Sequence, residues 1–159
     1  MRITVIAVGK IKEKYFTDAI AEYAKRLSRY CRLEIVELTD EKTPDGASNA
    51  QEIQIREKEG ERILKAIREG SYVVALAIEG KKQTSEKLAD FVEKRGVTGD
   101  SHLTFVIGGS LGLDKRVLDR ADYLLSFSDM TFPHQLMRVI LLEQIYRSFR
   151  IINHEPYHK

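Results

Sequence analysis

The stretch Phe105-Val-Ile-Gly-Gly-Ser-Leu-Gly112 indicates both how this chain folds and where it binds a ligand. It reads as an apolar strand that runs into a loop of glycine and small polar residues. The stretch Leu124-Leu-Ser-Phe-Ser-Asp-Met-Thr-Phe-Pro-His134 follows it and has the same form. In an open α/β sheet, ligands bind at the loops that follow the carboxyl ends of strands. We therefore expect a ligand site between these two loops.

Neither loop matches a common phosphate-binding motif. Gly108, Gly109 and Gly112 do not form G-x-G-x-x-G, and G-x-x-x-x-G-K-[ST] occurs nowhere in the chain. A Rossmann dinucleotide site and a P-loop are therefore both disfavoured. The glycine pair alone fits either a backbone that a ligand approaches closely or a tight turn without a ligand. The second loop of small and polar residues favours the ligand.

Strand and helix patterns alternate along the whole chain. Apolar runs predict strands at residues 2–8, 33–38, 72–78, 103–107 and 123–126. Apolar residues at three- and four-residue spacing predict helices at residues 13–29, 50–68, 85–94 and 115–119, and a long helix after Pro133. This alternation predicts one α/β domain over residues 1–159, with a mostly parallel sheet and helices on both faces.

The sequence also predicts which residues of the middle helices face the core and which residue caps one of them. In the helix at residues 50–68, the apolar residues Ile53, Ile63, Leu64 and Ile67 are expected to face the core. Ser85 is expected to cap the helix that follows it, because serine is a common N-cap residue.

The long helix after Pro133 carries an unusually wide apolar surface. Its apolar residues form two stripes, one of Met137, Leu141, Ile145 and Phe149 and one of Val139, Leu142 and Tyr146. A surface of this width exceeds what one sheet face covers, so the helix is either sandwiched within the domain or packed on a second subunit. Because 159 residues leave little material to cover both stripes, we favour a homodimer.

The composition is that of a soluble globular domain, with 43% hydrophobic and 31% charged residues. A single cysteine, Cys31, excludes an internal disulfide and a cysteine-rich zinc site, and its place beside a strand predicts a buried thiol. No apolar run approaches the ~20 residues that span a bilayer. The apolar part of the N-terminal strand is too short for a signal peptide. We therefore expect a cytoplasmic protein without a membrane partner.

The net charge of +2 is too small to indicate a nucleic-acid partner, but its distribution is uneven. Residues 1–30 carry seven Lys and Arg against three Asp and Glu, and residues 130–159 carry four against two. The middle, residues 31–129, carries fifteen against nineteen. If the two ends meet in space, they form a basic surface suited to a polyanion. Charge alone is equally compatible with an ordinary solvated surface.

Several strings, taken together and in order, resemble one family. They are Ile6-Ala-Val-Gly-Lys10, the two loops, Arg138 with Glu143-Gln-Ile-Tyr-Arg147, and Pro156-Tyr-His158. They resemble the RlmH family, the bacterial rRNA pseudouridine N3-methyltransferases of the SPOUT class. The resemblance spans the whole chain, but nothing is carried over for residues 43–68. It implies an α/β fold with a C-terminal trefoil knot, a homodimer formed through the knotted region, and a short functional tail at about residues 151–159.

The resemblance also implies the cofactor, S-adenosylmethionine as methyl donor, with no metal. The implied cofactor-binding residues are Leu76, Gly108, Phe127, Ser128, Asp129, Met130, Thr131 and Phe132. These residue types suit the task, because glycine lets the backbone approach the ligand and the apolar side chains provide walls for its ring. Glu79 either faces the amino group of the methionine moiety or caps the following loop.

By the same resemblance, the substrate is the pseudouridine of helix 69 in 23S rRNA, within the assembled 70S ribosome. The implied catalytic residues are Arg147, Tyr157 and His158. An arginine stabilises a developing imidate anion or holds a phosphate, a histidine accepts a proton near neutral pH, and a tyrosine stacks on an extruded base. The residue that takes the N3 proton and the roles of His134 and Arg138 stay open.

The basic group Lys10, Lys12 and Lys14 is expected to hold rRNA phosphates. Two other functions remain open for the chain as a whole. One is a different SPOUT enzyme that methylates a ribose hydroxyl of tRNA or rRNA. The other is a nucleotide-binding or ribosome-associated factor without catalytic activity, built on a flavodoxin-like sheet.

Overall fold

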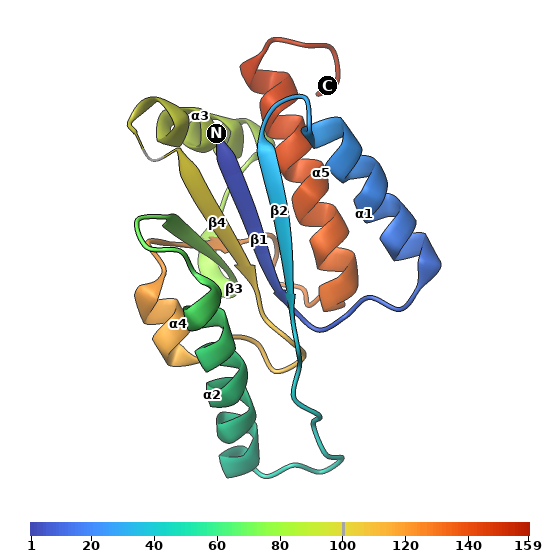
Figure 1. The fold of residues 1–159 in the computed structure, drawn as a ribbon, viewed down its shortest axis with the longest axis vertical. Helices are drawn as coiled ribbons and strands as arrows, with labels where there is room; N and C mark the ends of the chain where they lie inside the picture. Colours follow the sequence, from blue (N-terminus) through green and yellow to red (C-terminus); the bar gives the residue numbers. More distant parts are fainter. Residues whose placement is uncertain (100) are drawn as a thin grey trace.

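The computed structural model describes residues 1–99 and 101–159. Within these residues, five parallel strands form one sheet in the order β2-β1-β4-β3-β5, which confirms the predicted α/β fold with a parallel sheet (Figure 1). The strands are β1 (Arg2–Val8), β2 (Arg32–Leu38), β3 (Tyr72–Lys82), β4 (His102–Ile107) and β5 (Tyr123–Ser126). Because all strands are parallel, their carboxyl ends lie at one edge of the sheet.

Helices cover both faces of the sheet, as the alternation predicted. The helices are α1 (Lys14–Leu27), α2 (Asn49–Ala66), α3 (Ser85–Val97), α4 (Lys115–Arg120) and α5 (His134–Ile152). Side chains alternate along β1, so that Ile3 and Val5 pack with α1, α3 and α5, whereas Ile6 and Val8 pack with α2 and α4. The sheet is therefore the middle layer of three, with a separate apolar cluster on each of its faces.

Two positions in the helices differ from the sequence prediction. Ile53 is 41% exposed, because the inward face of α2 runs through Ile55, Glu59 and Ile63 at four-residue spacing. Thr84, not Ser85, is the N-cap of α3, and its hydroxyl accepts a hydrogen bond from the backbone N–H of Lys87.

Strand β3 runs four residues beyond its predicted end at residue 78. It pairs with β4 only as far as Ala75, and its pairing with β5 is interrupted between Leu76 and Lys81. The residues between these two pairings, 77–80, bulge away from the regular ladder. Residues 77–79 of this bulge form one wall of the cavity described below, together with Leu76.

Helix α5 is sandwiched within the chain. Leu141, Leu142 and Ile145 are completely buried, and Tyr146 and Phe149 are nearly so. The sheet, α1 and α3 pack against this helix (Figure 1). The wide apolar surface that favoured a dimer is thus largely covered by the same chain. The homodimer and the trefoil knot therefore stay predictions that rest on the family resemblance.

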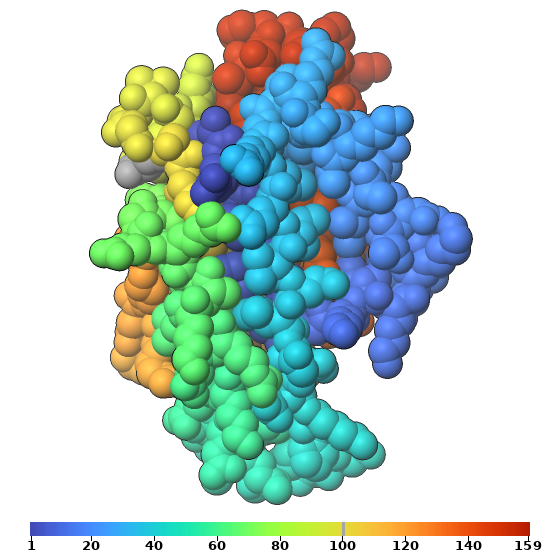
Figure 2. All heavy atoms as spheres, viewed as in Figure 1, coloured from blue at the N-terminus to red at the C-terminus, as the bar shows by residue number. Residues whose placement is uncertain are grey.

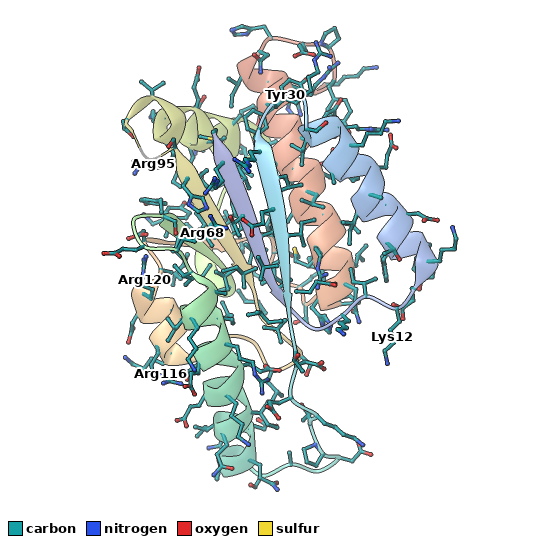
Figure 3. All side chains as sticks on the ribbon, viewed as in Figure 1. Lys12, Tyr30, Arg68, Arg95, Arg116 and Arg120 are labelled. Carbon is teal, nitrogen blue, oxygen red and sulfur yellow. The ribbon has the colours of Figure 1, made fainter. Side chains whose placement is uncertain are left out.

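The C-terminal segment packs against the turn that joins α1 to β2. The hydroxyl of Tyr30 donates to the carboxylate of Glu155 at 2.9 Å, and Arg150 binds the same carboxylate. Tyr30 lies at this end of the molecule in Figure 3, and Figure 2 shows the C-terminal segment packed against the α1–β2 turn. Lys12 lies at the opposite end of α1 and points outward (Figure 3).

Two further features of the described residues bear on function. Cys31 is buried as predicted, and burial raises the pKa of its thiol to about 11, so it is a poor nucleophile at neutral pH. None of the described helices is long and apolar enough to cross a membrane.

Candidate active site

A cavity of about 950 Å³ opens at the carboxyl edge of the sheet. Its walls come from residues 76–79 after the regular part of β3, residues 107–113 after β4, and residues 125–135 after β5, together with Met137 of α5. The two loops singled out in the sequence therefore line one cavity. Its volume falls within the range of small-molecule and cofactor sites.

The loop after β4 turns back so tightly that only glycine fits at its start. A Cβ atom on Gly108 would lie 2.9 Å from the carbonyl carbon of Gly112 and 3.0 Å from a methyl group of Leu113. Gly112 itself has a φ of +82°, a conformation that favours glycine. The buried carboxylate of Glu59 lies behind Gly109, where an added Cβ would approach it to 3.1 Å. Burial raises the pKa of the Glu59 carboxyl.

The loop after β5 is shaped by its serines. The hydroxyl of Ser126 donates to the carbonyl of Ser128 at 3.1 Å, and the hydroxyl of Ser128 accepts from the N–H of Met130 at 3.0 Å. These bonds curl the loop, so that Phe127, Ser128, Met130, Thr131 and Phe132 line the cavity with Leu76 and Gly108. Asp129 does not line it. Its carboxylate pairs with Lys82, and its side chain is 78% exposed.

The three residues expected to be catalytic also lie together. The guanidinium of Arg147 donates to the Glu143 carboxylate at 2.7 Å and to Nδ1 of His158 at 3.2 Å, and it lies 4.6 Å from the ring centre of Tyr157. The hydroxyl of Tyr157 donates to Glu143 at 3.0 Å. Burial, followed by this hydrogen bond, raises the pKa of Tyr157 to about 12, so the phenol stays protonated. We call Glu143, Arg147, Tyr157 and His158 the tail cluster.

Both ring nitrogens of His158 are occupied in this cluster. A guanidinium only donates, so Nδ1 of His158 must accept the bond from Arg147. Nε2 then carries the ring hydrogen and donates to the carboxylate of Glu86, 2.8 Å away at the start of α3. The imidazole therefore has no free lone pair with which to take a proton while the tail is docked.

The tail cluster and the cavity lie at opposite ends of α5. His134, Gln135 and Met137 at the start of the helix line the cavity, whereas Arg147 lies in its last third. At ~1.5 Å per residue, Arg147 is about 20 Å along the helix axis from His134. Figure 1 shows the same separation, with the C-terminus at the far end of α5 from the loops that follow the strands.

A buried arginine lies on α5 next to the residues that line the cavity. Arg138 is only 2% exposed and donates to the carboxylate of Glu37 at 2.5 Å and to the carbonyl of Gly9 at 3.0 Å. These bonds join the start of α5 to the carboxyl ends of β1 and β2. Arg138 is thus held in place and does not line the cavity, but its charge acts on His134, one turn earlier on the same helix.

Residues 1–158 match a protein-family model described as "Predicted SPOUT methyltransferase". This chain belongs to the SPOUT methyltransferase family. It is 66% identical over 159 residues to "Ribosomal RNA large subunit methyltransferase H" of Bifidobacterium adolescentis and 60% identical to the protein of that name from Acetivibrio thermocellus. Both alignments cover 100% of each chain.

A solved structure has a similar fold at low sequence identity. It is "a probable methylase family protein from Haemophilus influenzae Rd KW20", with a TM-score of 0.52 and 14% identity. The likeness covers 99% of this chain and 70% of that one. At this identity the likeness concerns the fold alone.

Sequence reasoning missed one part of the cavity of this SPOUT methyltransferase. Arg56 reaches the cavity from α2, a segment expected only to cover the sheet, and no motif singled it out. Glu79 also lines the cavity, and its carboxylate has no hydrogen-bond partner among the described residues. It is therefore free to meet a ligand group. Within the described residues, no group of three or more His, Cys, Asp and Glu side chains is arranged to hold a metal.

If the cavity holds the methyl donor that the sequence resemblance implies, Gly108→Val is expected to abolish its binding while the protein stays folded. The valine side chain would meet the backbone of Gly112 and force the glycine loop out of its turn. Equilibrium dialysis with S-adenosylmethionine measures the affinity, and circular dichroism measures folding. The matched control is Gly96→Ala in α3, where the added Cβ meets only the flexible end of Met1. Unchanged affinity in Gly108→Val would show that the cofactor binds elsewhere.

Proposed function

We propose that this SPOUT methyltransferase transfers a methyl group from S-adenosylmethionine to N3 of a pseudouridine in helix 69 of 23S rRNA. We further propose that the substrate is the assembled 70S ribosome in the cytoplasm. The observation that carries this proposal is the match, at 60–66% identity over the full length, to proteins named as large-subunit rRNA methyltransferases. The cavity and the tail cluster provide the groups that such a reaction needs.

The cavity suits S-adenosylmethionine. Gly108 and Gly112 keep the loop folded back along the cavity wall, and Leu76, Phe127 and Phe132 provide apolar walls for an adenine ring. Backbone groups of residues 127–132 offer hydrogen bonds. Asp129 is not among the residues that we propose to contact the cofactor, because it pairs with Lys82 and does not line the cavity.

When bound, the cofactor supplies an electrophilic methyl group on a sulfonium, so the protein mainly has to orient the reactants. The protein must also favour the N3 anion over the neutral imide. Arg147 offers a cation for the developing negative charge. Hydrogen bonding to Glu143 raises the pKa of Arg147 further, so this cation is permanent. Tyr157 packs against Arg147 and keeps it in position.

The separation of the cavity from the tail cluster supports a homodimer with shared active sites. Arg147 of one chain is about 20 Å along α5 from the cavity of that chain. An active site that uses both clusters must therefore take the cavity from one protomer and the tail cluster from its partner. Such an arrangement requires each protomer to contribute to both sites, as expected for a two-fold dimer.

Two unpaired cations at the same edge of the sheet as the cavity support an RNA substrate. Lys10 and Lys12 follow β1 at the carboxyl edge of the sheet, and neither pairs with a carboxylate among the described residues. Lys14 pairs with Asp18 across an exposed helix turn, which makes it a weaker phosphate ligand. We assign the phosphates that flank the target nucleotide to Lys10 and Lys12.

The product nucleoside tests the proposed reaction. Ribosomes from a strain that lacks this enzyme are incubated with protein and cofactor, and the 23S rRNA is digested and analysed by mass spectrometry. A methyl group on the pseudouridine base supports the proposal. A methyl group on a ribose would leave the base mass unchanged and would indicate a 2′-O-methyltransferase instead. No methyl group in any RNA would indicate a binding factor without catalytic activity.

A further inference from the structure

His134 lines the cavity without a hydrogen-bond partner among the described residues. It is the first residue of α5, half-buried, and it lines the cavity beside Phe132 and Pro133. Its Nε2 atom lies 3.4 Å from the position that a Cβ on Gly9 would occupy, so the turn after β1 packs directly against the ring. No residue in the described part of the chain forms a hydrogen bond with this imidazole.

The surroundings keep the ring uncharged. Burial lowers the pKa of His134, the guanidinium of Arg138 lowers it further, and the carboxylate of Asp40 raises it slightly. Arg138 is fixed by Glu37 and the carbonyl of Gly9, so its effect on the ring is permanent. A neutral imidazole holds one lone pair, and here no protein group uses it.

The other candidate proton acceptors are less suited. His158 is hydrogen-bonded at both ring nitrogens, and Tyr157 stays protonated. Glu79 also lines the cavity, but its side chain is exposed at the bulge of β3, outside the regular strand pairing. Among these groups, His134 is the one with a free lone pair on a rigid element.

We infer that His134 is the catalytic residue that accepts the N3 proton of the target pseudouridine. This inference rests on the proposed function. The N3–H bond breaks, the proton goes to the free ring nitrogen of His134, and the N3 electron pair forms the bond to the methyl carbon. The carbon–sulfur electron pair stays on the sulfur, and the imidazolium then releases its proton to solvent. Arg138 is the positioning residue that keeps the ring neutral between turnovers.

The first test needs neither cofactor nor substrate. The four histidines are followed by NMR in the free protein across a pH titration, and the His134 signal is assigned by its loss in His134→Asn. We expect His134 to titrate below the ordinary histidine pKa of about 6.5. In Arg138→Lys, which retains the charge but loses the fork-shaped contact to Glu37 and Gly9, the His134 pKa is expected to change. A His134 pKa above that of an exposed histidine would overturn the inference.

The second test is the pH profile of single-turnover methyl transfer to ribosomes. In the wild-type protein the rate is expected to fall only below the lowered pKa of His134, because protonation removes the acceptor. His134→Asn is expected to transfer about 10²–10⁴-fold more slowly at neutral pH, a typical contribution of general-base catalysis. Its rate is expected to rise with pH as the imide ionises by itself. Its affinity for S-adenosylmethionine should stay close to that of the wild type.

Two matched variants complete the design. His102→Gln replaces a histidine at the start of β4, at the end of the sheet opposite the cavity, and it is expected to leave the rate and its pH profile unchanged. Glu79→Gln removes the other candidate acceptor in the cavity. The inference would be overturned if His134→Asn kept the wild-type rate or lost the same factor in rate at every pH. It would also be overturned if Glu79→Gln, and not His134→Asn, showed a rate that rises with pH. Absence of transfer by the wild-type protein would refute the proposed function itself.

Discussion

Arg147→Ala is expected to lose nearly all methyl transfer while it still binds S-adenosylmethionine with wild-type affinity. The guanidinium contacts Glu143, His158 and the ring of Tyr157, so its loss removes the cation and releases the tail. Removing one such charge-stabilising group typically costs about 10²–10³-fold in rate. Single-turnover transfer to ribosomes and equilibrium dialysis with the cofactor measure the two properties separately.

The variants Arg147→Lys and Arg68→Ala sharpen this result. Lysine keeps the charge but not the fork that contacts two partners at once, so Arg147→Lys is expected to stay strongly impaired. Arg68 forms an exposed ion pair with Glu34 and belongs neither to the cavity lining nor to the tail cluster, so Arg68→Ala is expected to behave as the wild type. A wild-type rate in Arg147→Ala, or a matching loss of cofactor affinity, would remove Arg147 from the reaction.

The second large effect is the recovery of activity when two inactive chains are combined. Gly108→Val destroys the cavity and Arg147→Ala destroys the tail cluster, so each homodimer is inactive. If each site joins the cavity of one protomer to the tail of its partner, a heterodimer of the two variants has one intact site. We expect it to show about half of the wild-type activity. Heterodimers carrying two different affinity tags allow this measurement on a pure species.

The control heterodimer places both substitutions in one chain and none in the other. With shared sites, each active site then contains one damaged half, and this heterodimer is expected to be inactive. If each chain used its own tail, the outcome would be reversed: the first heterodimer would be inactive and the control would keep about half of the activity. The pair of heterodimers therefore decides between the two arrangements.

The sequence was sufficient to predict the fold because the period of its apolar residues is regular. The strands at residues 2–8 and 123–126 have the predicted bounds, and the helices begin and end within a few residues of the prediction. The errors are confined to a few positions. Residues 79–82 of β3 are polar or glycine, so nothing marked them as strand, and Ile53 is an apolar residue on the solvent side of its helix. In both places the contacts that decide the structure are distant in sequence.

The candidate site was only partly predictable for the same reason. The rule that ligands bind after the carboxyl ends of strands located both loops correctly in one cavity. Residue type alone could not reveal that Asp129 turns toward Lys82, or that Arg56 enters the cavity from α2. The hydrogen bonds that occupy both nitrogens of His158, and the distance between the tail cluster and the cavity, depend on how the chain folds back on itself.

The most direct test of the proposed function is the transfer of a labelled methyl group from S-adenosylmethionine to RNA. Intact 70S ribosomes from a strain that lacks this enzyme are compared with the naked 23S rRNA prepared from them. The proposal predicts label on the intact ribosomes alone, located in an N3-methylated pseudouridine of helix 69. Label in any other nucleoside, or no label on either substrate, would contradict it.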